Sequence, residues 1–127
     1  MRYLGIDYGR MRTGIALSDP DGRMAFPERV ILGAGAQVIQ AVGKIADAED
    51  VSVIVVGLPI GLDGKDTAET KEVRQFVGQL SAAVRVPVYF ENEMLTTRMA
   101  EAAGKGKMSD ASAAAIILQS YLDKRKG

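Results

Sequence analysis

The sequence predicts an α/β fold in which a mixed five-stranded sheet carries helices on both faces. The first 32 residues contain three strand-forming segments joined by short turns, and helical and strand-forming segments alternate after them. The run at 51–56 is nearly all β-branched and apolar, which is typical of a strand covered on both faces. A chain of 127 residues is long enough to bury one core. We therefore expect a single domain over residues 1–127, with the order β-β-β-α-β-α-β-α-α.

The N-terminal third predicts a three-stranded meander. Its strands are expected at 2–8, 13–18 and about 24–32. The second and third are separated by Asp19-Pro-Asp-Gly22, in which Pro presets φ and Gly tolerates positive φ, so this segment predicts a tight turn.

The remaining two thirds predict alternating helices and strands. Apolar residues at helical spacing predict a helix over 35–49, followed by the strand at 51–56. Asp66, with Glu69 three residues on, resembles a capping box at the start of an amphipathic helix that runs to about Val84. A strand is expected at 86–90, with Pro87 at its start. Two further helices are expected at 96–103 and 109–123, the second capped by Ser109.

Composition excludes several kinds of chemistry. The chain has no cysteine and no histidine, which removes disulfides, thiolate nucleophiles, zinc-thiolate sites and imidazole bases. No stretch approaches the roughly 18 apolar residues of a membrane span, so a cytoplasmic protein without a membrane partner is expected. The 16 basic and 16 acidic residues cancel, so overall charge does not indicate nucleic-acid binding. The basic cluster at 124–126 is expected to be a solvated surface or tail.

Asp7 is the first candidate functional residue, because it follows the apolar strand segment Tyr3-Leu-Gly-Ile6 directly. A buried carboxylate costs several kcal/mol unless it is paired or bound to a metal, on rough estimates. Alternation along the strand places Asp7 on the same face as Tyr3 and Gly5. The turn that follows contains Gly9 and leads to Gly14, and these glycines are expected to serve turn geometry and close backbone approach.

Further carboxylates fall where other elements end or begin. Glu91 and Glu93 lie at the end of the fifth strand, and Asp110 lies in the first turn of the last helix, where the helix dipole stabilises an anion. If the first and fifth strands run parallel, Asp7 and Glu93 come to one edge, with Asp110 laid over them. Oxygen ligands of this kind suit Mg²⁺ or Mn²⁺ rather than zinc. Phosphate-cleaving sites use such clusters to hold two ions that activate water and stabilise the leaving oxygen.

Four segments in order along nearly the whole chain resemble one known family. The segments are Leu4-Gly-Ile-Asp-Tyr-Gly9 with Arg12-Thr-Gly-Ile-Ala-Leu-Ser-Asp-Pro20, Val55-Val-Gly-Leu-Pro59 with Asp63-Gly64, Glu93 with Leu95-Thr-Thr97, and Asp110-Ala-Ser-Ala-Ala-Ala-Ile-Ile-Leu-Gln-Ser-Tyr121. Together they resemble the YqgF family, also called the RuvX family of Holliday junction resolvases.

This resemblance implies an RNase H-like fold and a metal-dependent nuclease. The substrate that the resemblance implies is the 5′ end of the small-subunit (16S) ribosomal RNA precursor. An older assignment, made by analogy, is that family members resolve four-way DNA junctions. The acidic positions of the family carry over to Asp7, Glu93 and Asp110, which the pattern of carboxylates had already indicated. We therefore expect these three residues to be catalytic and to bind Mg²⁺ or Mn²⁺.

The chain departs from the family pattern beside the catalytic glutamate. Asn92 and Met94 stand where the family usually has Asp and Arg, and Glu91 is a candidate to replace the lost charge. The loop at 103–108 is also short, whereas family members often carry a longer basic stretch there. These departures affect substrate grip and specificity more than the three acids.

Four basic residues are candidates for contacts with nucleic acid. Arg10 and Arg12 lie on the turn after Asp7, where they are placed to hold phosphates, and Lys105 and Lys107 lie in the Gly-rich loop. The expected partner is a structured RNA or a branched DNA. A junction resolvase needs two symmetric sites and hence a homodimer, whereas an RNA-processing enzyme can act as a monomer.

Two other function classes remain open on the sequence alone. The spacing of Asp7, Gly9 and Gly14 also fits the first phosphate loop of the actin, Hsp70 and sugar-kinase superfamily, although those proteins bind ATP between two such domains. The departures at Asn92 and Met94 also allow a non-catalytic module that binds RNA or the ribosome.

Overall fold

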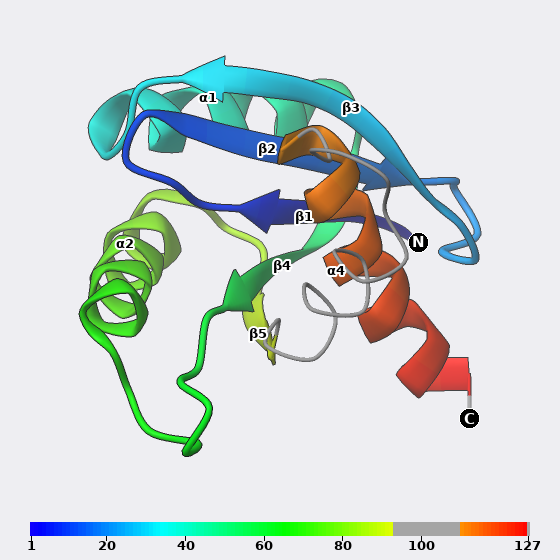
Figure 1. Ribbon diagram of the computed structural model, residues 1–127. Coiled ribbons are helices and arrows are strands. Elements are labelled where there is room, and N and C mark those ends of the chain that lie inside the picture. The colour runs from blue at the N-terminus through cyan, green and yellow to red at the C-terminus, as the bar shows by residue number, and fades with distance from the viewer. Residues whose placement is uncertain (93–109, 127) are drawn as a thin grey trace.

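The five-stranded sheet is the centre of the fold in the computed structural model, which describes residues 1–92 and 110–126 (Figure 1). Within these residues the elements are β1 (Arg2–Asp7), β2 (Arg12–Ser18), β3 (Ala25–Leu32), α1 (Ala36–Ala48), β4 (Val51–Leu58), α2 (Ala68–Ala83), β5 (Val88–Asn92) and α4 (Asp110–Lys126). The predicted helix at 96–103 and the predicted cap Ser109 lie outside the described residues.

The sheet is mixed, as predicted, with the strand order β3-β2-β1-β4-β5. β2 pairs antiparallel with β1 and β3, which gives the predicted meander. β4 pairs parallel with both β1 and β5. The carboxyl ends of β1, β4 and β5 therefore lie at one edge of the sheet, which is where open α/β sheets bind ligands.

Helices cover both faces of the sheet. α1 and α2 pack on one face against alternate side chains of β1 and β4, among them Leu4, Ile6 and Val56. α4 packs on the other face, where Tyr3 and Val55 belong to a second apolar cluster. Residues 53–56 of β4 alternate between the two clusters, which confirms the prediction of a strand covered on both sides. None of the described helices is long and apolar enough to span a membrane.

The start of α2 differs from the prediction. The N-cap is Thr67, whose side chain exchanges hydrogen bonds with Thr70 in a capping box, so the predicted box of Asp66 and Glu69 is wrong by one residue. Thr70 also donates its hydroxyl to the carbonyl oxygen of Pro59, which ties the helix to the end of β4. Asp66 instead accepts hydrogen bonds from Arg74. Threonine and aspartate are both residue types preferred at N-caps, so residue type alone did not show whether Asp66 or Thr67 caps the helix.

The ends of three other elements differ from the prediction by two residues or more, and the first is β4, which continues to Leu58 rather than ending at residue 56. β5 begins at Val88 rather than at residue 86, because Pro87 has no N–H and takes part through its carbonyl oxygen, which accepts from the Ile54 N–H at 3.0 Å. α4 continues to Lys126, beyond the predicted end at residue 123. Side-chain contacts hold this last turn, since Lys124 pairs with Glu91 and Arg125 lies over two tyrosine rings. The cluster at 124–126 is therefore helical rather than a loose tail.

Candidate active site

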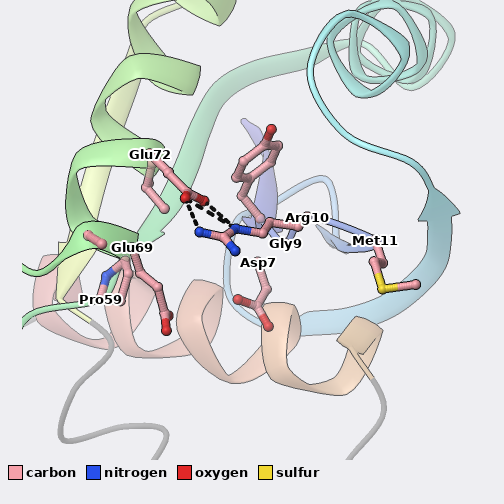
Figure 2. A pocket seen from close by; sticks show the side chains of 10 residues that line it. Asp7, Gly9, Arg10, Met11, Pro59, Glu69 and Glu72 are labelled. Atoms are coloured by element: carbon pink, nitrogen blue, oxygen red, sulfur yellow. Dashed lines mark hydrogen bonds and ion pairs between the residues drawn. The ribbon is translucent and has the colours of Figure 1, made fainter.

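Asp7 is the last residue of β1 and lies at the edge where the carboxyl ends of β1, β4 and β5 meet, on the face that α4 covers. It alternates with Tyr3 and Gly5, and both of these contact α4. The next residue, Tyr8, belongs to the other face, where its ring stacks on Phe76 at 4.0 Å between centroids. The hydroxyl of Tyr8 accepts from the Gly35 N–H. This anchoring holds the end of β1 and directs the Asp7 carboxylate toward α4 (Figure 2).

Asp7 is half-buried, so the expectation of a buried carboxylate is corrected. The strand ends at Asp7, and the carboxylate lines a cavity that opens at the edge of the sheet. Water therefore reaches part of this side chain, and the cost of desolvating its charge is smaller than for a group inside the strand.

Gly14 brings the first turn of α4 against the sheet. It is the partner of Asp7 in the antiparallel register of β1 and β2. A Cβ atom at Gly14 would lie only 1.9 Å from the carbonyl oxygen of Asp110. Paired Cα atoms in such a ladder are about 4.5–5.5 Å apart, so the backbone of Asp110 lies next to that of Asp7. The predicted close approach at Gly14 is confirmed, and it brings the backbone of Asp110 close to the strand end that carries Asp7.

A second close approach fixes the direction of α4 across β1. A Cβ atom at Gly5 would lie 2.8 Å from the Leu118 Cβ and 3.1 Å from the Ala114 carbonyl oxygen. Gly5 and Gly14 lie on the same face of neighbouring strands. Two contact points along one helix define its direction, so the position of Asp110 is set by the sheet itself.

The third candidate acid, Glu93, lies outside the described residues. It follows directly after Asn92, the last residue of β5, whose carboxyl end shares an edge with that of β1. Among the described residues there is no group of three or more acidic side chains close enough to hold a metal ion. Asp7 and Asp110 supply oxygen donors from two separate elements, and a complete triad with Glu93 stays a prediction.

A cavity of about 510 Å³ lies between the β1–β2 turn and the first turns of α2. Asp7, Arg10 and Met11 line one side, and Pro59, Glu69 and Glu72 line the other (Figure 2). Its position at the carboxyl ends of parallel strands is the one that the fold favours for a ligand. Nothing in the sequence pattern indicated Glu69 and Glu72 as cavity residues, because acids in the first turns of a helix are common on any surface.

Arg10 is held across this cavity by Glu72. Its Nε lies 3.1 and 3.0 Å from the two carboxylate oxygens of Glu72, and its Nη2 makes a further short contact with one of them. The hydrogen bond from Arg10 keeps the pKa of Glu72 below its usual value, and the same bond raises the pKa of Arg10. The pair therefore stays ionised at neutral pH, and the charge of Arg10 is already balanced.

Arg12 lies differently from Arg10. It begins β2, is exposed, and alternates with Gly14, so it belongs to the face that α4 covers. Within the described part of the chain it has no ion-pair partner. The other predicted phosphate ligands, Lys105 and Lys107, lie outside the described residues.

Glu91 binds side chains of α4 that lie far from Asp110. The prediction that Glu91 replaces the missing charge in the site is therefore wrong. Its carboxylate is 5% exposed and accepts from the Lys124 Nζ at 2.6 Å and from the Ser120 hydroxyl at 2.9 Å. Ser120 lies ten positions after Asp110, which is about 15 Å along a helix. Glu91 therefore fastens the C-terminal half of α4 to β5.

Replacing Glu91 with Gln is expected to lower the free energy of unfolding by about 1–3 kcal/mol, because a buried charge-assisted contact is lost. Any cleavage activity of the folded protein should stay within a few-fold. Urea unfolding and cleavage assays measure the two effects. Glu28→Gln is the matched control, since Glu28 pairs with Arg29 on the surface. If Glu91→Gln kept full stability and lost cleavage, Glu91 would belong to the site.

Comparison with known proteins identifies the family. The family model described as "RuvX: Holliday junction resolvase" matches residues 1–124. A relative from Nitratidesulfovibrio vulgaris, named "Putative pre-16S rRNA nuclease", is 41% identical, with 97% of this chain and 94% of that protein covered. A protein of the same name from Anaeromyxobacter dehalogenans is 36% identical, with 98% of each chain covered.

Solved structures with the same fold include two proteins in complex with Holliday junctions. RuvC of T. thermophilus in complex with a Holliday junction substrate superposes with a TM-score of 0.65 at 17% identity, over 100% of this chain and 96% of that one. The Fowlpox virus resolvase in complex with Holliday junction DNA gives 0.60 at 10% identity, over 100% of both chains. At these identities the likeness shows the fold alone, and it confirms the predicted RNase H-like architecture. The chain belongs to the RuvX family of nucleases.

Proposed function

We propose that this protein is a metal-dependent nuclease that hydrolyses phosphodiester bonds in the precursor of 16S ribosomal RNA. The observation that carries the proposal is the close approach of the Asp110 backbone to Gly14, the partner of Asp7 in the sheet, at the carboxyl end of β1. The name shared by curated relatives across nearly the whole length of the chain supports the substrate.

The donor atoms at this edge fit a divalent cation. Asp7 and Asp110 offer carboxylate oxygens from β1 and α4, and Glu93, the proposed third hard ligand, directly follows the last residue of β5 in the sequence. When bound, divalent cations activate the attacking water and stabilise the oxygen that leaves phosphorus. Cysteine and histidine are absent from the sequence, so neither a thiolate nor an imidazole is available as a metal ligand at this site.

The residues of the chain have separate tasks in this proposal. Asp7 holds its carboxylate at the end of a rigid strand, while Asp110 is positioned through the contact between α4 and Gly14. The exposed Arg12 lies on the same face and is placed to bind a phosphate of the substrate. Arg10 reaches the substrate only if its contact with Glu72 opens.

A panel of substrates tests the function. The purified protein is incubated with a precursor 16S RNA fragment, a mature 16S fragment, a four-way DNA junction and single strands, each with Mg²⁺ or Mn²⁺. Selective cleavage of the precursor is the expected result. A protein that cuts none of them with either ion would instead support a non-catalytic RNA-binding module.

Resolution of four-way DNA junctions is the second candidate, because the description of the matching family names it. This activity requires paired cuts on opposite strands, and therefore two sites related by symmetry in a homodimer. Symmetric nicks in the junction, together with a dimer in sedimentation experiments, would favour it over RNA processing.

The two arginines of the turn are expected to contribute unequally to binding. Arg12→Gln should weaken RNA affinity several-fold and reduce the magnitude of the salt slope by about one, because one phosphate contact is lost. Arg10→Gln should have a smaller effect, since Glu72 already balances that charge. Filter binding at several salt concentrations measures both, with Arg74→Gln as a control because Arg74 is likewise paired on α2. A larger loss for Arg10→Gln than for Arg12→Gln would contradict the assignment.

A further inference from the structure

Three tyrosines and an arginine form a cluster near the C-terminal end of α4. The rings of Tyr89 and Tyr121 are nearly parallel, at 15° and 6.3 Å between centroids, and Tyr3 lies 6.0 Å from Tyr121. The Arg125 guanidinium lies 5.7 Å from the ring centre of Tyr121 and 6.0 Å from that of Tyr3. We call these four residues the tyrosine cluster. It joins β1, β5 and α4, and the candidate active site uses none of its members.

The cluster presents aromatic surface to solvent. Tyr89 is 48% exposed although it lies within a strand, and Arg125 is exposed. Tyr3, by contrast, is buried in the apolar core. Tyr3 is thus the buried part of the cluster, and the exposed ring of Tyr89 is held nearly parallel to the ring of Tyr121. Burying exposed aromatic surface against a partner is favourable. Because the rings are already held in place, little side-chain entropy is lost on binding.

The charge around the cluster is suited to an anionic partner. Arg125 interacts with aromatic rings rather than with a carboxylate, so its positive charge is not cancelled by an ion pair within the described residues. Lys124 pairs with Glu91 but its side chain remains 65% exposed. Stacked aromatic rings combined with cationic side chains are the combination by which proteins bind unpaired bases of single-stranded nucleic acid.

The cluster lies on the same face of the sheet as Asp7. The register runs from Gly5 to Val55 and from Val55 to Tyr89, so Tyr89 is level with a residue two positions before Asp7. Two residues along a strand and two strand spacings across the sheet correspond to roughly 12 Å between the Cα atoms of Tyr89 and Asp7. One bound strand can therefore reach both places.

We propose that Tyr89, Tyr121 and Arg125 form a stacking surface that binds unpaired bases of a single-stranded segment of the substrate, beside the cleaved bond. The choice of nucleic acid as the partner rests on the proposed nuclease function. Tyr89 and Tyr121 would supply the stacking faces, and Arg125 would supply the cation near a phosphate or a base.

Binding without cleavage tests this surface. Affinity for a fluorescent 12-nucleotide single-stranded RNA is measured by anisotropy in the Asp7→Asn background with EDTA, so that the result does not depend on catalysis. Tyr89→Ala is expected to weaken binding about tenfold, because one stacked base is lost. Tyr89→Phe keeps the ring and should bind like the parent. Arg125→Gln should weaken binding and reduce the magnitude of the salt slope by about 0.7.

Phe90 provides the matched control. It is the next residue of β5, is 38% exposed, and lies under a guanidinium, that of Arg74, but on the opposite face of the sheet. Phe90→Ala should leave the affinity unchanged. Equal losses for Tyr89→Ala and Phe90→Ala, or no loss for Tyr89→Ala, would overturn the proposal. So would a change in self-association of Tyr89→Ala with no change in RNA affinity, which would make the cluster a protein interface.

Crosslinking of the unaltered protein gives a second test that does not depend on how the variants fold. Irradiation with an RNA that carries 5-iodouridine should attach the RNA to Tyr89 or Tyr121, as read by mass spectrometry of the peptides. Crosslinks confined to other residues would reject the surface. A protein that cleaves RNA but shows no such crosslinks would keep the nuclease function and lose this inference.

Discussion

Asp7→Asn is expected to abolish cleavage, with a loss of roughly 10³-fold or more, which corresponds to about 4 kcal/mol of barrier. The substitution keeps the shape of the side chain but removes the negative charge that attracts a divalent cation. Because Asp7 is half-buried at the end of a strand, the free energy of unfolding should change by about 1 kcal/mol or less. Cleavage rates at saturating Mg²⁺ and urea unfolding measure the two quantities.

Asp21→Asn is the control for this substitution. Asp21 is exposed and lies in the turn between β2 and β3, at the end of the sheet opposite Asp7. The same chemical change there should leave cleavage and stability as they are. If Asp7→Asn cleaved at the rate of the parent protein, the proposed metal site would be wrong. If it lost cleavage only because it was unfolded, Asp110→Asn would carry the test, since that carboxylate lies on a different element.

The architecture could be predicted because the sequence pattern is consistent at every level. Residues 53–56 alternate between two apolar clusters, so their continuous β-branched pattern corresponds directly to a strand buried on both faces. The turn at 19–22 is as predicted, with the Gly22 N–H donating to the Asp19 carbonyl oxygen and Gly22 at φ 69°. Backbone hydrogen bonds from Met24 and Arg23 hold the pKa of Asp19 below its usual value.

Single-residue boundaries were less predictable, because several residue types serve the same local purpose. Asp66 and Thr67 are both residue types preferred at N-caps, and the capping box forms at Thr67 with Thr70, whose hydroxyl also bonds to the carbonyl oxygen of Pro59. Likewise, the pattern of α4 weakens after residue 122, and the contacts that extend it come from Glu91 and Tyr3, which are distant in sequence.

The positions of Asp7 and Asp110 at the ends of their elements could be predicted, whereas the environment of Arg10 could not. A catalytic role for these acids stays a prediction. Asp7 and Asp110 followed from their places at the ends of elements, and Gly14 from the need for a close approach. The contact of Arg10 with Glu72 joins residues 62 apart in sequence and left no local signal. The same holds for the tyrosine cluster, whose members look like ordinary strand and helix residues until the sheet order is known.

Gly14→Ala is expected to damage the site without altering a charged residue. An added Cβ would lie 1.9 Å from the Asp110 carbonyl oxygen, whereas real Cβ contacts stay beyond about 3.0 Å, so α4 has to move by at least about 1 Å. A misplacement of that size can reduce a catalytic rate about 10²-fold. Overpacking of this kind also costs about 1–3 kcal/mol of stability. Cleavage is measured well below the melting temperature, so that only folded protein is compared.

Gly78→Ala is the matched control, because Gly78 lies in α2 with no atom within 4 Å of an added Cβ. It should raise stability by up to about 1 kcal/mol through helix propensity and leave cleavage unchanged. The informative quantity is the ratio of cleavage to folded protein. A Gly14→Ala protein that is less stable but cleaves normally would show that α4 accommodates the methyl group elsewhere. In that case the spacing between Asp7 and Asp110 would not be set by the contact at Gly14, and the positioning of Asp110 would need another cause.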